Sequence, residues 1–299
     1  MLRSTFTPLL HTIPSKPKPP NLFSHSISIS LSESPPTVRQ NASPTTAATT
    51  TTNPLHNLSP TSAYIHLPFC RKRCHYCDFP IVALGSSSTQ TNDINNDPRI
   101  SNYIHLLCRE IKATNSQFNH NPPLKTVFFG GGTPSLVPPR LVSLVLETLN
   151  LKFGLCLDAE ISMEMDLGTF DVVKMKELMG MDLISSLPHQ TPQMWEESLL
   201  LTVNARPKHV SVYDLQVERG TKFGILYSPG EFPLPSETQS AEFYKTASRM
   251  LSDAGYNHYE ISSYCKDNFE CKHNLTYWDN KSFYGFGLGS TSFLGGFRF

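Results

Sequence analysis

Three cysteines that lie close together in the sequence are the residues best suited to chemistry. Cys70, Cys74 and Cys77 fall in the stretch YIHLPFCRKRCHYCDF, with three residues between the first two and two between the second pair. The chain has seven cysteines in all, an odd number that includes this tight cluster. Such usage favours metal binding in a reducing compartment over the disulfide framework of a secreted protein.

Two kinds of metal site are open to three neighbouring thiolates. A structural zinc ion takes four protein ligands, so the fourth would be His66, His75 or a remote residue. An iron–sulfur cube is usually held by four cysteines. With only three, one iron keeps no protein ligand and can chelate a small molecule through an amine and a carboxylate.

The segments that must position these cysteines alternate between β-branched or aromatic runs and helical patterns. The expected strands are Ala63–Leu67, Thr126–Phe129, Glu160–Met165, Asp182–Leu187, His209–Leu215 and His258–Ser262. The expected helices are Ile100–Asn115, Pro139–Lys152, Phe170–Met179, Pro192–Val203 and Glu237–Ala254. Thr191 is the expected N-cap of the fourth helix, and Gly255 ends the fifth. This alternation predicts parallel strands joined by right-handed crossovers.

Each motif with chemical potential comes directly after an expected strand. The cysteines follow Ala63–Leu67, the turn GGGTP follows Thr126–Phe129, and Glu164 lies near the end of the next strand. Glycines at a strand end let the backbone approach a ligand without interference from a Cβ atom. Because sites on parallel sheets form at the carboxyl ends of strands, we expect these motifs to meet at one edge.

The Cys-x3-Cys-x2-Cys spacing, with Tyr64 before it and Tyr76 inside it, resembles the signature of the radical S-adenosylmethionine (SAM) superfamily. The resemblance implies that the three cysteines hold a [4Fe-4S] cluster whose free iron binds SAM. In that family an electron from the cluster cleaves SAM to a 5′-deoxyadenosyl radical, while the protein positions the cofactor. The SAM contacts that the resemblance carries over are Tyr64, Gly131, Gly132, Thr133, Glu164 and Asp182.

Further stretches resemble one branch of the superfamily, the coproporphyrinogen oxidase-like proteins, and within it the heme chaperones of the HemW type. These stretches include FFGGGTPSL, EISMEMDLGTF, DLISSLPHQT, HVSVYDLQVERGTKFG and HNLTYW. The oxygen-independent oxidases carry a further cysteine two positions after the last cluster cysteine, where this chain has Phe79. The resemblance therefore implies delivery of heme to apoproteins. The alternative is oxidation of coproporphyrinogen III in porphyrin biosynthesis.

The stretch HNLTYW indicates where heme would bind. A neutral histidine can ligate heme iron, and aromatic rings pack well against a porphyrin face. His273, Tyr277 and Trp278 supply both within six residues, and the HemW resemblance implies heme binding at His273. The alternative is that Tyr277 and Trp278 fill the core. Cys265, Cys271 and His273 are an alternative set of metal ligands. Cys108 lies in a helical pattern and is expected to be a small buried hydrophobic residue.

The first sixty residues differ in composition from the rest. Ser, Thr and Pro make up half of them, and Glu33 is the only acidic residue. Such a segment is expected to be disordered, and its Ser/Thr-rich, acid-poor character is typical of a transit peptide, for a plastid or alternatively a mitochondrion. The formal net charge of the chain is zero, which does not favour a nucleic-acid partner, and no apolar run is long enough to span a membrane.

The chain departs from the family pattern at two places. Gly180 leads directly to Met181 and Asp182, where the family has a further strand and helix. The C-terminal helical region of the family is also missing after Phe299. The predicted fold is therefore an incomplete radical SAM (β/α) barrel of parallel strands over residues 61–299, behind a tail of residues 1–60. A truncated product without function is a further alternative.

Overall fold

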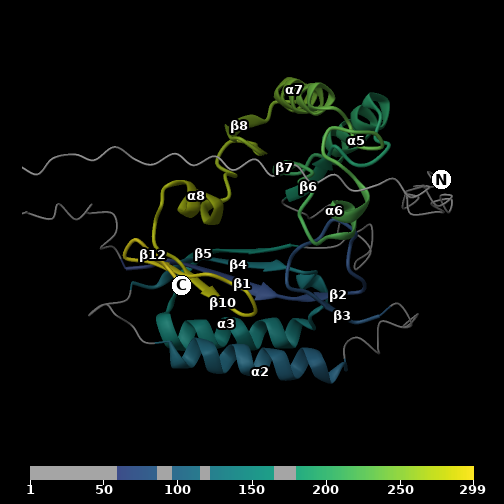
Figure 1. Cartoon of the computed structure of the whole chain (residues 1–299). Helices are drawn as coiled ribbons and strands as arrows, with labels where there is room; N and C mark the ends of the chain where they lie inside the picture. Colours follow the sequence, from purple (N-terminus) through teal and green to yellow (C-terminus); the bar gives the residue numbers. More distant parts are fainter. Residues whose placement is uncertain (1–58, 86–95, 115–121, 165–179) are drawn as a thin grey trace, which may run out of the picture. The chain divides into compact units, whose positions relative to one another are not determined.

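The first sheet lies directly next to the cysteine loop. The structure is a computed structural model that describes residues 59–85, 96–114, 122–164 and 180–299 (Figure 1). Four strands form the sheet in the order β10-β1-β4-β5, and every neighbouring pair is parallel. Their bounds are Ser62–Leu67 for β1, Leu124–Gly131 for β4, Leu155–Met163 for β5 and Tyr284–Phe286 for β10.

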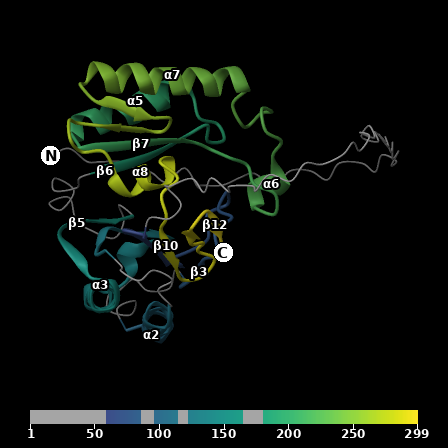
Figure 2. The ribbon, with the colours of Figure 1, turned by 90° about the vertical axis from the view of Figure 1, so that its left-hand side faces the viewer.

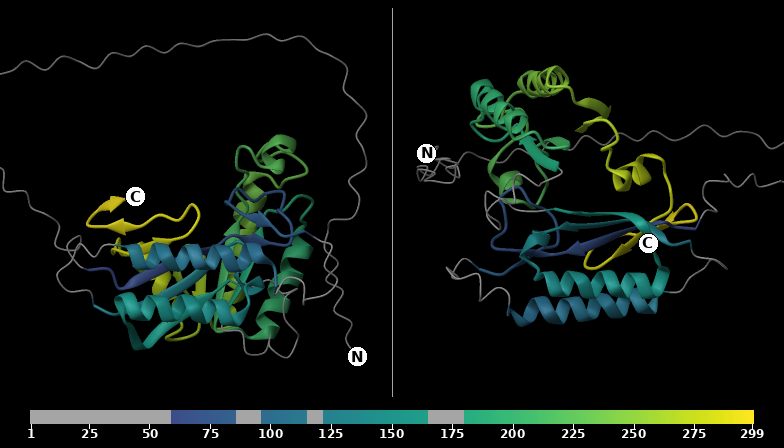
Figure 3. Two further views of the ribbon diagram at one scale, coloured as in Figure 1. Left: turned by 90° about the horizontal axis from the view of Figure 1, so that it is seen from below. Right: turned by 180° about the vertical axis from the view of Figure 1, so that it is seen from behind.

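Two helices cover one face of this sheet. They are α2 (Pro98–Ala113) and α3 (Pro139–Phe153), which run side by side beneath the strands (Figures 1 and 3). The buried side chains of α2 recur at helical spacing: Ile100, Ile104, Leu107, Cys108 and Ile111. They pack with strand residues such as Ile65 and Val127 into one core, so the expectation of a buried Cys108 is confirmed.

The opposite face of the sheet holds α8 (Lys272–Trp278) (Figure 1). Alternation along β4 places Val127 and Phe129 in the helical core, while Thr126 and Phe128 face α8. The sheet thus has an apolar face under α2 and α3 and a face with polar side chains under α8. The chemistry predicted from the sequence lies on and beside this second face.

A second sheet has the order β6-β7-β9-β8. Its strands are β6 (Gly180–Ser185), β7 (His209–Asp214), β8 (Asn257–Glu260) and β9 (Ser263–Cys265). The β6–β7 pair is parallel, whereas β9 is antiparallel to both β7 and β8. Two helices, α5 (Pro192–Ala205) and α7 (Glu237–Asp253), pack together on it (Figure 2). Trp195 is buried there and donates from Nε1 to the carbonyl of Phe243 at 2.9 Å.

Short elements complete the described part of the chain. They are β2 (Phe69–Cys70), β3 (Val82–Ala83), the 3-10 helix η2 (Pro134–Leu136), α6 (Lys222–Leu226), β11 (Phe293–Leu294) and β12 (Phe297–Arg298). Among the helices of the described residues, none has the length and apolar character needed to cross a membrane.

Most of the expected elements are present with shifted ends. Thr191 caps α5 through its side chain, with Pro192 in the first turn, and Gly255 follows α7 with φ +78°, as expected. The prediction of parallel strands is wrong for the C-terminal segment, because β8 and β9 form an antiparallel pair. Neither α8 nor β10 was predicted. The expected helix Phe170–Met179 lies outside the described residues, as does nearly all of the N-terminal tail.

The two sheets are not hydrogen-bonded to each other within the residues described. β5 is the last strand of the first sheet, and β6 is the first strand of the second. The strand and helix that are expected to be missing would fall between these two strands. In the described residues, strand pairing therefore does not join β5 to β6 in one continuous barrel. The missing strand and helix stay a prediction.

Candidate functional site

The cysteine loop follows the carboxyl end of β1, and backbone hydrogen bonds join its two ends. β2 and β3 pair in parallel, and Leu84 N donates to the carbonyl of Cys70 at 2.8 Å. Inside the loop, Cys77 N donates to the carbonyl of Cys74 at 3.3 Å. The Arg73 guanidinium donates to the carbonyls of Cys77 and Phe79 at 3.2 and 2.9 Å. The loop therefore folds back on itself, and its backbone is held by these contacts.

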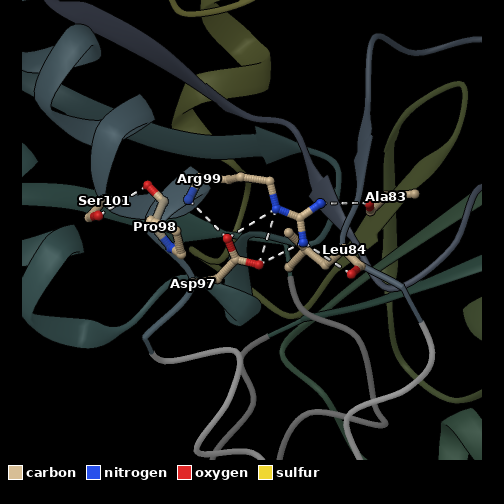
Figure 4. Close-up of polar contacts among 6 residues, drawn as sticks. All are labelled: Ala83, Leu84, Asp97, Pro98, Arg99 and Ser101. Carbon is tan, nitrogen blue, oxygen red and sulfur yellow. Dashed lines mark hydrogen bonds and ion pairs between the residues drawn. The ribbon is translucent and has the colours of Figure 1, made fainter.

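An arginine on α2 ties the end of this loop to the helical layer (Figure 4). Arg99 forms a bidentate ion pair with Asp97, which also caps the helix by accepting from Arg99 N at 2.9 Å. The same guanidinium donates to the carbonyls of Ala83 and Leu84 at 3.3 and 3.1 Å. A single side chain thus fixes the strand that leaves the cysteine loop.

The short helix α6 packs against the loop from the second half of the chain. Phe223 N donates to the carbonyl of His75 at 2.9 Å, and the Phe223 ring contacts the rings of His75 and Tyr76. Lys222 Nζ lies 3.3 Å from Nε2 of His75. Because His75 is engaged in this way, it does not complete a tetrahedral zinc site in the observed arrangement.

A cavity of about 460 Å³ opens between the loop and α6. It is lined by Arg73, Cys74, His75, Cys77, Asp78, Arg219, Gly220, Thr221 and Lys222. Cations outnumber the single carboxylate, so the cavity favours a ligand with negative charge. Sequence reasoning missed Arg219 to Lys222 as site residues. Their signal was the stretch ERGTKFG, in which Thr221 caps α6 by accepting from Gly224 N.

The three thiols are close enough to influence one another. Burial raises the pKa of Cys70, the Thr133 hydroxyl at 3.6 Å lowers it, and the nearby thiols Cys74 and Cys77 raise it again. Burial and Cys74 together raise the pKa of Tyr76 to about 12. A bound cationic centre would offset this repulsion and favour the Cys70 thiolate.

The candidate ligands do not form a closed site for a single ion in the described residues. In the part of the chain that is described, no three His, Cys, Asp or Glu side chains converge to the spacing of a single metal ion. The candidate zinc ligand His66 is buried, with Nε2 3.2 Å from the carbonyl oxygen of Pro80. Thiolates on an iron–sulfur cube lie farther apart than the ligands of one ion. Cys74 and Cys77 line the cavity, and Cys70 lies at the start of the same loop.

The glycine turn after β4 packs directly against the cysteine loop. Gly132 N donates to the carbonyl of Leu67 at 2.9 Å, and Thr133 N donates to that of Phe69 at 2.6 Å. A Cβ on Gly132 would lie 2.7 Å from the Phe69 carbonyl oxygen, and one on Gly131, which has φ +109°, would overlap the His66 ring. The glycines therefore serve the close approach of two backbone segments, a role that their sequence motif did not predict.

Glu164 joins the end of β5 to this turn. Its Oε2 accepts from Gly131 N at 3.0 Å. Burial raises the pKa of Glu164 to about 7, while the Gly131 N–H lowers it and the Asp182 carboxylate raises it. Burial and Glu164 also raise the pKa of Tyr64, whose hydroxyl lies 3.3 Å from Nδ1 of His66. The structure thus brings Tyr64, the turn and Glu164 together, with Asp182 within electrostatic range.

The HNLTYW stretch forms α8, and each of three strands holds it by a side chain. Ser62 on β1 bonds Thr276 at 2.9 Å, and Thr126 on β4 bonds Nδ1 of His273 at 2.9 Å. Glu160 on β5 accepts from the backbone N–H groups of Lys272 and His273, both at 3.3 Å. The helix is therefore fixed across the face of the first sheet.

His273 is not open to a ligand in this arrangement. It is 1% exposed, its ring stacks on Phe128 at 5.2 Å, and its Nε2 lies 2.6 Å from the Tyr277 hydroxyl. Burial lowers the pKa of His273 to about 4, so the ring is neutral near pH 7. Tyr277 and Trp278 are 38% and 53% exposed, so the alternative that both fill the core is wrong.

The other suggested metal-ligand set is not assembled. Cys265 is fully buried in β9, while Cys271 Sγ donates to Glu160 at 3.8 Å. Among the residues that the structure describes, Cys265, Cys271 and His273 do not come together as a metal-binding group.

Comparisons with known proteins identify the family. The sequence model of the radical SAM superfamily matches residues 64–198. The heme chaperone HemW of Synechocystis is 38% identical over 288 aligned residues, covering 81% of this chain and 68% of the relative. The chain belongs to the HemW family of radical SAM proteins. HemW of Bacillus subtilis is 30% identical, with 79% of this chain and 72% of the relative covered.

A solved structure supports the same fold. The radical SAM enzyme coproporphyrinogen III oxidase (HemN) of Escherichia coli superimposes with a TM-score of 0.60 at 18% identity. The match covers 81% of this chain and 66% of that structure, just under two thirds of its length. At this identity the likeness establishes an α/β fold with a parallel sheet and no activity.

The HemW alignment also contains positions that this chain lacks. Since 81% of 299 residues is about 242, about 46 of the 288 aligned positions have no residue here. A strand and helix of the kind expected to be missing after Gly180 would account for a gap of this size, because a βαβ unit takes about 30 or more residues. The place of the gap along the chain stays a prediction.

Proposed function

We propose that this chain binds heme and delivers it to apoproteins, in keeping with the name heme chaperone that its HemW relatives carry. A [4Fe-4S] cluster on Cys70, Cys74 and Cys77, with SAM on its open iron, belongs to this proposal as a resident cofactor. The observation that carries the proposal is the attachment of α8, with its HNLTYW sequence, to β1, β4 and β5. The carboxyl ends of these same strands provide the cysteine loop, the glycine turn and Glu164.

The chain's own residues would perform distinct tasks around the cofactor. When bound, a reduced cluster of this type supplies one electron to the ligand on its open iron. Thr133 donates to Cys70 and thereby favours its thiolate. Arg73 fixes the loop by binding its carbonyls, and α6 covers His75 and Tyr76 on the second side. Glu164 is positioned at Gly131 to accept from a hydroxyl or an ammonium group of SAM.

A row of aromatic rings connects the SAM residues with α8. Tyr64 stacks on Phe128 at 6.2 Å, and Phe128 stacks on His273 at 5.2 Å. A change in the position of the Tyr64 ring would therefore shift the Phe128 ring and, through it, the His273 ring. This contact supports the proposal that cofactor binding and cargo binding are parts of one function.

The experiment that tests this function is a heme transfer assay under anaerobic conditions. Reconstituted protein is loaded with hemin, separated from free hemin and mixed with a heme-free acceptor protein. We expect the Soret absorption to pass from this chain to the acceptor. Conversion of coproporphyrinogen III with SAM and a reductant, without heme transfer, would contradict the proposal. No observation favours that oxidase activity here, and Phe79, at the position of its additional cysteine, is 55% exposed.

We also propose that residues 1–60 direct the chain to plastids. Their Ser, Thr and Pro content and their single acidic residue support this assignment. Fusion of residues 1–60 to a fluorescent protein tests it. Plastid fluorescence is the expected result, and mitochondrial or diffuse fluorescence would contradict it.

A further inference from the structure

The cysteine loop and the segment before α6 carry a group of exposed basic side chains. We call this group the basic patch, and its five members are Arg71, Lys72, Arg73, Arg219 and Lys222. Lys222 Nζ lies 3.3 Å from Nε2 of His75, and Phe223 N donates to the His75 carbonyl at 2.9 Å. The two segments that form the basic patch are therefore in direct contact.

The charge of this surface differs from that of the chain as a whole. In residues 71–78 and 218–222 the acidic residues are Asp78 and Glu218, so five basic against two acidic residues give a formal charge of +3, compared with zero for the chain. In the described part of the chain, neither Lys72 nor Arg219 has a carboxylate within ion-pair distance. Exposed cations of this kind attract an acidic surface and raise the rate of encounter with it.

Apolar side chains are exposed next to the basic patch. Phe79 follows Asp78 in the cysteine loop and is 55% exposed, and Ile225 on α6 is 77% exposed. Interfaces between proteins combine apolar contacts with a polar or charged rim. A small anion would gain little from the apolar side chains, so this combination favours a protein as the partner.

Cys74 lies between the basic residues and is itself exposed. A cluster held by Cys74 and its two neighbouring cysteines would therefore have one side close to this surface. Once such a cluster has given an electron to its ligand, it must be reduced again by a partner. Because electron transfer between proteins becomes slow with distance, the partner must approach the cysteine loop closely. The basic patch is the charged surface at that place.

We propose that the basic patch is the docking surface for a one-electron donor protein that has an acidic surface. This inference rests on the proposed function, because it requires the cluster on Cys70, Cys74 and Cys77. One electron leaves the reduced centre of the donor and enters the cluster, so that the donor is oxidised and the cluster reduced by one electron each. No bond forms or breaks. Since electron-transfer complexes are small and weak, their association should depend strongly on salt.

The test uses the full chain, reconstituted without oxygen, and an acidic plant-type [2Fe-2S] ferredoxin as the probe. Affinity for immobilised ferredoxin is measured at about 10 mM and about 1 M salt, where the Debye length is about 30 Å and about 3 Å. The rate of cluster reduction by reduced ferredoxin is followed by electron paramagnetic resonance (EPR). We expect binding and fast reduction at low salt, and the loss of both at high salt.

Charge reversal locates the docking surface. Lys72→Glu combined with Arg219→Glu should weaken ferredoxin binding and slow reduction by ferredoxin about 10-fold or more at low salt. The matched control is Lys112→Glu combined with Lys125→Glu, which changes the net charge equally at two exposed positions. Lys125 is six residues, or about 20 Å, along β4 from Gly131 in the turn beside the cysteine loop. The control should retain both properties.

A small uncharged reductant separates docking from the state of the cluster. Photoreduced deazaflavin should reduce the cluster of Lys72→Glu as fast as that of the wild type, whereas ferredoxin should reduce it more slowly. Equal rates with ferredoxin in these two proteins would overturn the proposal. Thermal unfolding and iron analysis identify any variant that does not fold or does not hold a cluster.

Other outcomes overturn the docking surface alone. They are equal losses in the two double variants, ferredoxin binding that is indifferent to salt, and binding to vesicles of anionic phospholipid without binding to ferredoxin. Each would leave the cluster and the proposed heme transfer intact. A chain that assembles no cluster would instead overturn the cofactor part of the proposed function, and this inference with it.

Discussion

The carboxylate of Glu164 accepts a hydrogen bond from the backbone N–H of Gly131 at 3.0 Å. This bond joins the end of β5 to the turn after β4, next to the loop of cysteines. Because Glu164 is partly buried and loses contact with water, its pKa rises from 4.5 to about 7, so the contact responds to pH. Glu164 thereby links the stability of the site to its protonation.

Glu164→Gln should remove one pH dependence of stability. The pKa of Glu164 is higher in the folded chain than in the unfolded one, so its protonation favours folding. The full contribution is present below pH 4.5 and is lost as the pH rises through about 7. Above this range the carboxylate costs no more than about 3 kcal/mol, the equivalent of the pKa difference. Chemical denaturation at pH 5 and pH 8 measures the effect.

The variant should be relatively more stable than the wild type at pH 8, because glutamine still accepts from Gly131 without a charge. An equal difference in the free energy of unfolding between the two proteins at both pH values would contradict the prediction.

His273 should produce a dependence on pH of opposite sign. Burial lowers its pKa from 6.5 to about 4, so the folded chain favours the neutral ring. Stability from this group is present above pH 6.5 and is lost as the pH falls toward 4. His273→Gln should therefore flatten the acid side of the stability profile, as measured by denaturant midpoints from pH 7 to pH 4. A wild type and variant with parallel acid profiles would argue against a buried neutral imidazole.

Gly132→Ala should disrupt the contact between the glycine turn and the cysteine loop. Its Cβ would lie 2.7 Å from the Phe69 carbonyl oxygen, and the clashing atoms are backbone. We expect a loss of about 1–3 kcal/mol, typical of overpacking, together with reduced iron content after reconstitution. Thermal unfolding and iron analysis measure these changes.

The control is Gly230→Ala, since Gly230 has φ +76° and a Cβ added there would meet no heavy atom within 4 Å. That variant should show only the conformational cost of a positive φ and should keep its iron. Equal iron loss in both variants would show that the turn has no special role.

Arg99→Ala should loosen the strand that leaves the cysteine loop while leaving the core intact. Arg99 binds the carbonyls of Ala83 and Leu84 from an exposed position, so global stability should change little (Figure 4). Hydrogen exchange of the 82–85 amides should become faster. Arg109→Ala, at an exposed position on the same helix, is the control. An unchanged rate of hydrogen exchange at these amides in Arg99→Ala would contradict the role of Arg99 in holding this strand.

The sequence predicted the elements whose signals are local. Runs of β-branched and aromatic residues predict β1 and β4. Thr191 begins α5 and Gly255 follows the end of α7, as expected from cap chemistry. The cysteine spacing and the glycine turn likewise predict a shared edge. These features depend on neighbours in sequence, so a single chain suffices to predict them.

The features that escaped prediction depend on distant residues. Thr126 and His273 are 147 positions apart, and their bond decides that the imidazole is buried. Glu160 has no local signal that it caps α8, because the helix begins 112 positions later. The cavity residues Arg219 to Lys222 meet the cysteine loop only through the fold. Side-chain exposure at Tyr277 is likewise a result of tertiary packing.

The most direct test of the central claim is EPR spectroscopy of anaerobically reconstituted, reduced protein with and without SAM. We expect iron and sulfide in the ratio of a [4Fe-4S] cluster and a signal that changes when SAM is added. Cys74→Ala should lose this signal, whereas Cys156→Ala should keep it, because Cys156 lies on β5 away from the cysteine loop. A bound zinc ion in place of iron, or an iron signal indifferent to both SAM and Cys74→Ala, would contradict a three-cysteine cluster with an open vertex.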